Sequence, residues 1–250
     1  MEEKRHWLAF ALLWPVFIVQ ALWLRLTVEK LAEPPCPRRG RAGQGPRLRL
    51  LVLGDSAGAG VGAGKQAEGL TGRLVRKLQD DFEVHWTIHA KTGWTTLDCL
   101  DGLDGLEAQA FDAVITSLGV NDATGLVPTS AWIAQQECLA WRLLERFQKP
   151  LLFLSGVPPI RQFPGLPQPL RWWLDLRAAR YSRILKDWCG TREECEFIEL
   201  VAPFTPDMMA ADGFHPGPPV YEIWAGLVAE AVRTRFPRPQ VSMQRGHSPN

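Results

Sequence analysis

Short apolar runs alternate with segments of helical periodicity along the chain from Arg47 onward. Leu70, Leu74 and Leu78, for example, follow the spacing of a helix that is apolar on one face. A repeated order of strand, helix and strand is typical of a parallel sheet covered by helices on both faces. The pattern therefore predicts an α/β fold, a three-layer α/β/α domain built around a parallel sheet.

Five of the apolar runs have the length and composition of strands. They are RLRLLVLGDS (47–56), EVHWTIHAKTG (83–93), FDAVITSLGVND (111–122), KPLLFLSGVPP (149–159) and CEFIELV (195–201). Helical periodicity predicts helices over about 130–147, 169–188 and 220–235, and a shorter one near 96–106. We therefore expect a five-stranded parallel sheet.

A separate apolar segment precedes this domain. From Trp7 to Leu24 the chain has eighteen residues without a charge. As a helix this segment would be about 27 Å long, close to the roughly 30 Å hydrocarbon thickness of a bilayer. A cleaved signal peptide is the alternative, but its apolar region is shorter and ends in a small-residue cleavage site of the Ala-x-Ala kind, which is not found here. We predict an uncleaved, single-pass transmembrane helix within residues 1–28.

The side of the membrane on which the domain lies stays open. More basic residues follow the apolar segment than precede it, which favours a cytoplasmic domain. They are Arg25, Lys30, Arg38, Arg39 and Arg41 after it, and Lys4 and Arg5 before it. An exported domain on the opposite side of the membrane is the alternative.

The remaining segments complete the predicted domain organisation. Residues 29–46 are rich in Pro, Gly and Arg and lack apolar periodicity, so they are predicted to form an extended linker. The folded domain is expected over residues 47–236. Residues 237–250 have no apolar period and are predicted to be a disordered tail.

Charge and cysteine content narrow the classes of function. The chain has 28 Lys and Arg residues against 27 Asp and Glu residues, so it has no bulk charge that would attract nucleic acid. Its five cysteines are scattered and form no zinc-like pattern. Buried free thiols are the favoured interpretation of Cys189 and Cys195, and a disulfide between them is the alternative. We expect no nucleic-acid partner and no metal site.

Candidate reactive residues follow the predicted strands at their carboxyl ends. Asp55 and Ser56 follow the first strand, Gly93 ends the second, and Asn121 and Asp122 end the third. In open parallel sheets the loops at these ends meet over one crevice. A later loop, DGFHP (212–216), adds an aspartate and a histidine.

The residue types fit acyl transfer through a serine nucleophile. A serine hydroxyl needs a neighbouring imidazole to accept its proton, and the imidazole needs a carboxylate to fix its tautomer. Ser56, His215 and Asp212 can fill these roles. The oxyanion of the intermediate needs hydrogen-bond donors, for which the backbone amides of Ser56 and Gly93 and the side-chain amide of Asn121 are candidates. This chemistry requires no cofactor.

Four segments of the sequence resemble the conserved blocks of the SGNH/GDSL hydrolase family, and they occur in the order of that family. They are LGDSAGAGVG (53–62), the glycine of AKTGWTT (90–96), GVND (119–122) and DGFHP (212–216). The resemblance covers residues 47–236 and implies a flavodoxin-like sheet, a Ser-Asp-His triad of Ser56, Asp212 and His215, and Ser56, Gly93 and Asn121 as oxyanion donors. One departure is Ala57, where the family's motif has leucine, and another is the glycine-rich loop that follows it.

The same residues allow other interpretations. Ser56 alone would be an ordinary helix cap, and Asp55 and Asp122 are expected to support the site through hydrogen bonds. The segment Gly58–Ala63 fits the glycine pattern of a nucleotide-binding loop, which makes a nucleotide-binding α/β domain one alternative function. A non-catalytic binding protein with the same fold is another.

The expected substrate is a small-molecule ester, and the predicted anchor favours a lipid-like one. The sequence leaves the acyl group and the leaving group open. Trp172 and Trp173 lie on a predicted helix, where packing in the core is the default and lining of an acyl pocket the alternative.

Overall fold

The computed structural model describes residues 2–35 and 37–237, and its centre is a six-stranded mixed sheet. The strand order is β1-β3-β2-β4-β5-β6. The strands are β1 (Arg39–Ala42), β2 (Arg47–Gly54), β3 (Glu83–Ala90), β4 (Ala113–Ser117), β5 (Leu151–Ser155) and β6 (Cys195–Ile198). Residues 238–250, nearly all of the predicted disordered tail, lie outside the described residues.

The prediction of a purely parallel, five-stranded sheet is wrong in one respect. The five predicted strands are present and pair in parallel, but β1 adds a sixth strand that runs antiparallel to β3, with Arg39 opposite Thr87 and Ala42 opposite Val84. This strand lies within the segment 29–46 predicted as a linker. Its sequence, RGRA, has no apolar alternation because β1 is a short, exposed edge strand held by backbone hydrogen bonds.

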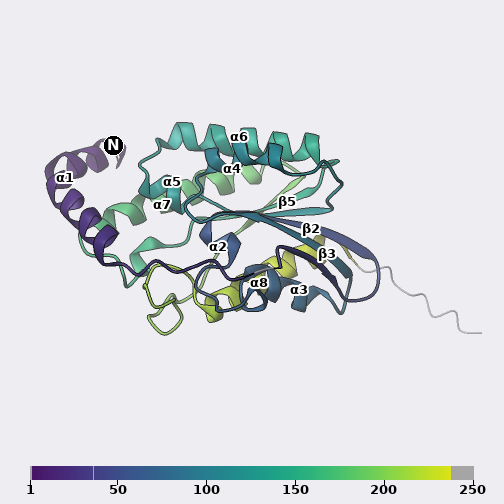
Figure 1. Ribbon diagram of the computed structural model, residues 1–250. Coiled ribbons are helices and arrows are strands. Elements are labelled where there is room, and N and C mark those ends of the chain that lie inside the picture. The colour runs from purple at the N-terminus through teal and green to yellow at the C-terminus, as the bar shows by residue number, and fades with distance from the viewer. Residues whose placement is uncertain (1, 36, 238–250) are drawn as a thin grey trace, which may run out of the picture.

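Helices cover both faces of the sheet, as the alternation of elements predicts. Figure 1 shows α3 (Leu70–Leu78) and α8 (Pro218–Arg235) below the sheet, and α4 (Thr96–Gly102), α6 (Thr129–Arg146) and α7 (Leu170–Cys189) above it. The short helices α2 (Ser56–Ala59) and α5 (Val120–Thr124) follow β2 and β4 directly. The central strand β2 is buried along nearly its whole length, which explains its continuous apolar run.

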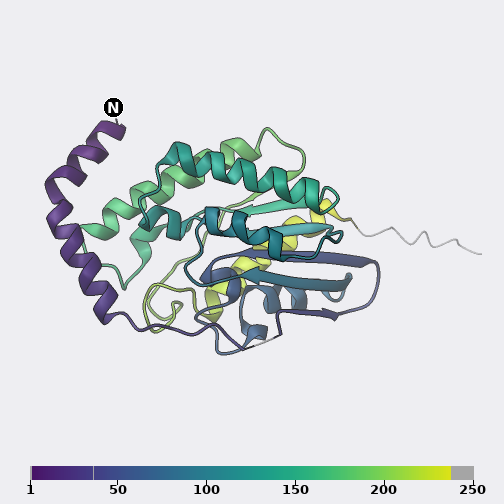
Figure 2. The ribbon, with the colours of Figure 1, turned by 45° about the horizontal axis from the view of Figure 1, so that its top comes forward.

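The N-terminal helix α1 (Glu2–Thr27) stands outside these layers and packs against α7. Figures 1 and 2 both place it beside the N-terminal end of α7. The ring of Phe17 lies 5.4 Å from that of Trp173, and Gln20 exchanges hydrogen bonds with the backbone of Gln168 and Leu170 at 2.5 and 3.1 Å. The window from Phe10 to Thr27 has a mean hydropathy of 1.6, with 6% of it buried. Its length and composition are those of a membrane anchor and also of a signal sequence.

Cys189 and Cys195 are free, buried and adjacent, which agrees with the favoured interpretation. A hydrogen bond between the two thiols, together with burial, raises the pKa of Cys189. Cys36 lies outside the described residues.

Candidate active site

Ser56 lies at the carboxyl end of β2, where it begins the short helix α2. Gly54 precedes this turn, and a Cβ atom there would lie 2.4 Å from the carbonyl oxygen of Ser117 on the neighbouring strand. Asp55 caps the helix by accepting hydrogen bonds from the Ala57 amide and the Ser117 hydroxyl, both at 3.0 Å. The turn thus fixes Ser56 at the edge of the sheet, with 8% of its surface exposed.

Asp212 and His215 lie in the loop that precedes α8. One carboxylate oxygen of Asp212 accepts hydrogen bonds from the backbone amides of Phe214 and His215, both at 2.9 Å. The other oxygen lies 2.5 Å from His215 Nδ1. Burial alone would raise the pKa of Asp212, but the hydrogen bonds from the imidazole and the two amides outweigh it and lower this pKa. Asp212 is therefore held as a carboxylate that faces the imidazole.

The loop and the β2 turn meet although they are far apart in sequence. His215 Nε2 lies 3.0 Å from Ser56 Oγ, across a separation of 159 residues. A continuous hydrogen-bonded chain therefore runs from Asp212 through His215 to Ser56. In this arrangement the imidazole can accept the serine proton at Nε2 while the carboxylate holds Nδ1 protonated.

Gly93 and Asn121, the other predicted oxyanion donors, lie on the loop after β3 and in helix α5. Gly93 has a φ of +86°, a backbone conformation that favours glycine. A Cβ atom there would meet nothing within 4 Å, so crowding does not explain the glycine. Asn121 lies within α5 rather than at a strand end. Its Nδ2 donates one hydrogen bond to the Trp94 carbonyl at 2.8 Å, which leaves a second N–H for a ligand.

Asp122 is buried behind the site and is bound to Thr96 at the start of α4. Its carboxylate accepts hydrogen bonds from the amide and hydroxyl of Thr96, each at 3.1 Å. Gln136 of α6 also donates to the Thr96 hydroxyl, at 2.9 Å. Burial raises the pKa of Asp122 above its ordinary value. These contacts tie α5, which carries Asn121, to α4 and α6.

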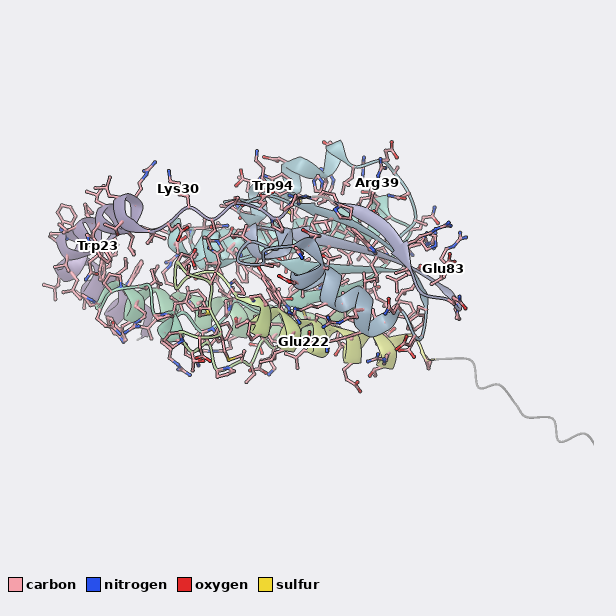
Figure 3. All side chains as sticks on the ribbon, turned by 60° about the horizontal axis from the view of Figure 1, so that its bottom comes forward. Trp23, Lys30, Arg39, Glu83, Trp94 and Glu222 are labelled. Carbon is pink, nitrogen blue, oxygen red and sulfur yellow. The ribbon has the colours of Figure 1, made fainter. Side chains whose placement is uncertain are left out.

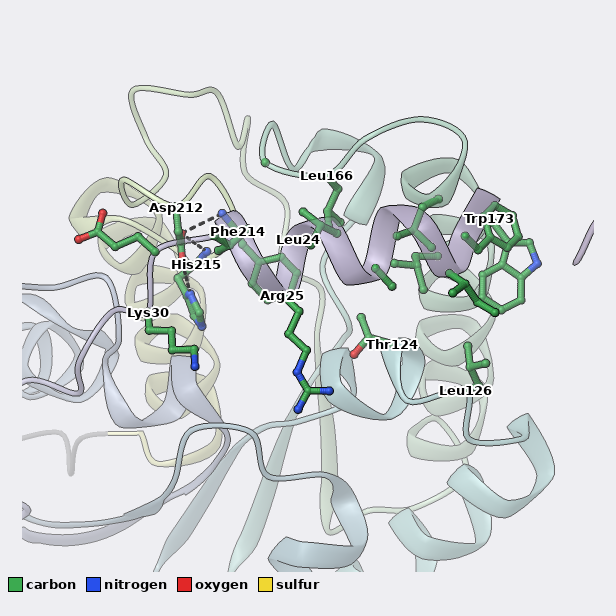
Figure 4. A pocket seen from close by; sticks show the side chains of 18 of the residues that line it. Leu24, Arg25, Lys30, Thr124, Leu126, Leu166, Trp173, Asp212, Phe214 and His215 are labelled. Atoms are coloured by element: carbon green, nitrogen blue, oxygen red, sulfur yellow. Dashed lines mark hydrogen bonds and ion pairs between the residues drawn. The ribbon is translucent and has the colours of Figure 1, made fainter. Parts of the chain in front are cut away.

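Two cavities adjoin the histidine, and His215 and Phe214 line both. The smaller, about 40 Å³, is also lined by Ser56 and Asn121. The larger, about 620 Å³, extends between α1 and the domain. In Figure 4 it runs from His215 and Asp212 at one end to Trp173 and Leu126 at the other. The sequence analysis did not predict that α1 would form one wall of this cavity. The signal for a contact with the domain was Gln20, the one polar side chain among residues 7–24.

The glycine-rich loop after Ser56 is packed against protein at Val61 and Gly62. A Cβ atom on Gly62 would lie 2.2 Å from the Pro216 carbonyl oxygen, and the Val61 carbonyl accepts a hydrogen bond from Tyr221 at 2.5 Å. A nucleotide-binding loop of this kind also needs an acidic residue for the ribose at the carboxyl end of the second strand, but Glu83 is the first residue of β3 and lies at the opposite end of that strand. These contacts disfavour the nucleotide-binding alternative. Across residues 2–35 and 37–237, no group of three His, Cys, Asp or Glu side chains is arranged to hold a metal ion.

Known proteins are similar to this chain in sequence. The sequence profile of the GDSL-like lipase/acylhydrolase family matches residues 52–223. A GDSL-like esterase of Mycobacterium tuberculosis (strain ATCC 25618 / H37Rv) is 27% identical over 202 residues, which cover 74% of this chain and 62% of that protein. The chain thus spans less than two thirds of the length of this curated relative.

Solved structures share the fold at low sequence identity. The lipase Lip_vut3 from a goat rumen metagenome superposes with a TM-score of 0.62 at 22% identity, over 74% of this chain and 97% of that one. A family 3 carbohydrate esterase of Clostridium thermocellum superposes with a TM-score of 0.60 at 16% identity, over 76% of this chain and 98% of that one.

Proposed function

Because the chain belongs to the GDSL-like lipase/acylhydrolase family, we propose that it hydrolyses carboxylic esters with Ser56 as its nucleophile. The observation that supports this most directly is the hydrogen-bonded chain of Asp212, His215 and Ser56, with distances of 2.5 and 3.0 Å. In this proposal His215 is the general base and Asp212 its orienting carboxylate.

The proposed reaction has two halves. Ser56 Oγ attacks the ester carbonyl while His215 Nε2 takes its proton, and the C–O bond to the alcohol breaks as His215 returns that proton to the leaving oxygen. Water then attacks the acyl-enzyme carbonyl while His215 accepts its proton, and the bond between the acyl carbon and Ser56 Oγ breaks as His215 returns that proton to the serine oxygen, which releases the carboxylic acid. The amides of Ser56 and Gly93 and the free N–H of Asn121 stabilise the oxyanion in both halves.

Asp55 and Asp122 act on this machinery through the backbone in the proposal. Asp55 holds the turn that presents Ser56, and Asp122 holds the helix that presents Asn121. Neither carboxylate has a hydrogen bond to Ser56 or His215 among those of the described residues, which supports a positioning role for both.

The substrate in this proposal is a small-molecule ester, and α1 is an uncleaved membrane anchor. The contacts of α1 with α7 support retention of the helix, because a cleaved segment would leave Trp173 and the Leu170 amide uncovered. The side of the membrane stays undecided.

Covalent labelling tests the proposal. The full-length protein in detergent should react with a fluorophosphonate probe, and Ser56→Ala should abolish the labelling. Ser130→Ala is the matched control because Ser130 is exposed on α6, and it should label like the wild type. A wild-type protein that is folded but unlabelled would favour the alternative of a non-catalytic binding protein.

A further inference from the structure

The 620 Å³ cavity beside His215 has an apolar composition that ester hydrolysis alone does not require. The helix α1 contributes Phe17, Ala21 and Leu24 to its lining, and the domain contributes Leu166, Leu170 and Trp173. Its volume falls within the roughly 300–1,000 Å³ of sites that enclose small molecules. By contrast, the cavity of about 40 Å³ at Ser56 accommodates only a few atoms. Of these two cavities, only the larger can therefore hold a long hydrocarbon chain of the substrate.

The wall formed by α1 is fixed to the domain by hydrogen bonds and by aromatic contacts. Gln20 binds the backbone of Gln168 and Leu170, and Phe10 and Phe17 contact the ring of Trp173 at 5.1 and 5.4 Å. Farther along the chain, Glu33 accepts hydrogen bonds from the amide and hydroxyl of Thr92, at 2.7 and 2.8 Å. The segment after α1 is thereby attached to the loop that carries Gly93. The cavity is thus a built feature that spans from the helix to the reactive edge of the sheet.

Polar groups lie at the His215 end and in the middle of the cavity. Figure 4 shows Lys30 on the side of the cavity that holds His215, and Arg25 extending from α1 into the space between His215 and Thr124. The far end, toward Trp173 and Leu126, is apolar. This polarity matches an amphiphile whose ester group lies at His215 and whose chain points away from it.

The outer face of α1 exposes further apolar side chains, among them Val19, Leu22 and Leu26, which are 66%, 54% and 84% exposed. One helix thus faces the cavity on one side and is suited to lipid on the other. Figure 3 shows Trp23 of α1 at the opposite end of the molecule from Glu83 and Arg39, so this apolar region is confined to the end that holds the cavity.

We infer that α1 forms part of the substrate site, and that the cavity between α1 and α7 binds the hydrocarbon chain of a long-chain lipid ester. The inference rests on the proposed function for its reaction but not for its binding. It assigns α1 two roles, attachment to the bilayer through its exposed outer face and formation of one wall of the chain-binding site through the face that packs against the domain.

Bulky substitutions on the two faces of α1 test this inference in the full-length protein in lipid nanodiscs. Ala21→Trp and Ile18→Trp place an indole in the cavity, and Leu22→Trp and Val19→Trp place it on the outer face as matched controls. Both cavity variants should lower kcat/KM for p-nitrophenyl palmitate by about tenfold or more and leave that for p-nitrophenyl acetate within about twofold. The outer-face variants should change neither value. Hexadecyl acetate, which carries the chain on its alcohol, determines which side of the ester enters the cavity.

A binding measurement separates this inference from the proposed hydrolysis. The Ser56→Ala protein should bind a radiolabelled long-chain alkyl ether, and the added Ala21→Trp or Ile18→Trp should weaken binding about tenfold. If ether binding is lost in these variants and the wild-type protein hydrolyses none of the esters, the chain site is supported and the proposed function is overturned. Palmitate turnover and ether binding that are unaffected by both cavity variants would overturn the chain site and leave the hydrolase intact.

Discussion

Two buried carboxylates close to Ser56 have pKa values displaced in opposite directions. Burial raises the pKa of Asp55 from 3.8 to about 6, although hydrogen bonds from Ser117 and from the amides of Ala57 and Gly58 oppose the rise. Asp212 is also buried, but its bonds to the His215 imidazole and to two amides lower its pKa. Each carboxylate accepts three hydrogen bonds, so the opposite directions follow from the deeper burial of Asp55 and from the imidazole partner of Asp212.

Asp55 should make the fold less stable as the pH rises. Its folded-state pKa of about 6 lies above the ordinary 3.8, so the folded protein binds the proton more tightly and the free energy of unfolding falls as pH rises through this window. Asp55→Asn removes the titration. Its free energy of unfolding, relative to wild type, should rise by on the order of 3 kcal/mol from below pH 4 to pH 7, at roughly 1.4 kcal/mol per pH unit. Urea unfolding at several pH values measures this, and a constant difference would contradict it.

The residues of the candidate site were predicted from sequence because each carries a local signal. Ser56, Gly93 and Asn121 follow apolar runs at points where strands of a parallel sheet end, and Asp212 and His215 share one short motif. Phe214 and Leu166 line the cavities without any such signal, because an apolar residue in a loop has the same appearance whether it covers the core or a ligand.

At the scale of elements, the glycine-rich loop after Ser56 acts as packing for the loop that carries His215. Gly62 has a φ of +93°, and a Cβ atom there would lie 2.2 Å from the carbonyl oxygen of Pro216, the residue after His215. The glycine pattern that resembles a nucleotide-binding loop therefore has a different physical cause, the close approach of two loops.

Gly62→Ala should accordingly reduce activity by moving His215. Displacement of a catalytic group by about 1 Å can cost about 10²-fold in rate, and we expect a fall in kcat of that order for p-nitrophenyl acetate. Gly105→Ala is the matched control, because a Cβ atom at Gly105 meets nothing within 4 Å. Circular dichroism checks that both variants fold. Wild-type kcat in a folded Gly62→Ala protein would refute the packing role.

Glu222 joins α8 to α3 through three basic side chains. It pairs with Arg73, with Arg76 at 2.7 Å and with Lys77 at 2.6 Å. Hydrogen bonds from Lys77 and Arg73 lower its pKa to about 2 in spite of partial burial. Figure 3 shows Glu222 on α8, on the side of the sheet away from α6. The network fixes the helix that directly follows the His215 loop.

Glu222→Gln should lower the free energy of unfolding by about 1 kcal/mol at neutral pH, since solvent screens this partly exposed network. Glu222 stabilises the fold above pH 4.5, and this contribution is lost as pH falls toward its folded-state pKa of about 2. The difference from wild type should also shrink in high salt. Glu230→Gln, an exposed position on the same helix, serves as control. Equal unfolding midpoints for the two variants at pH 7 and low salt would argue against the network.

The edge strand β1 shows which elements the hydrophobic pattern cannot reveal. Its residues are mostly exposed, and Gly40 lies so close to Trp86 that a Cβ atom would approach the indole to 2.6 Å. Pairing here depends on backbone bonds and on the absence of a side chain. The central strands were predicted because both of their faces are buried and their sequences record that burial.

On the scale of the whole molecule, α1 links the membrane question to the substrate question. Its sequence predicts a membrane segment, but the contacts of Gln20 and Phe17 with α7 depend on tertiary structure that an apolar run does not encode. An anchor that also borders the reactive edge would bring the site close to the bilayer surface. The flavodoxin-like layering and the domain boundaries stay predictions.

The central claim is that the hydrogen-bonded chain of Asp212, His215 and Ser56 performs ester hydrolysis. Its most direct measurement is kcat for p-nitrophenyl acetate with the purified full-length protein, compared among wild type, Ser56→Ala, His215→Ala and the control Ser130→Ala. Replacement of either Ser56 or His215 should lower kcat by about 10⁴- to 10⁶-fold, while Ser130→Ala should retain wild-type turnover. Turnover near that of the wild type in Ser56→Ala or His215→Ala would contradict it.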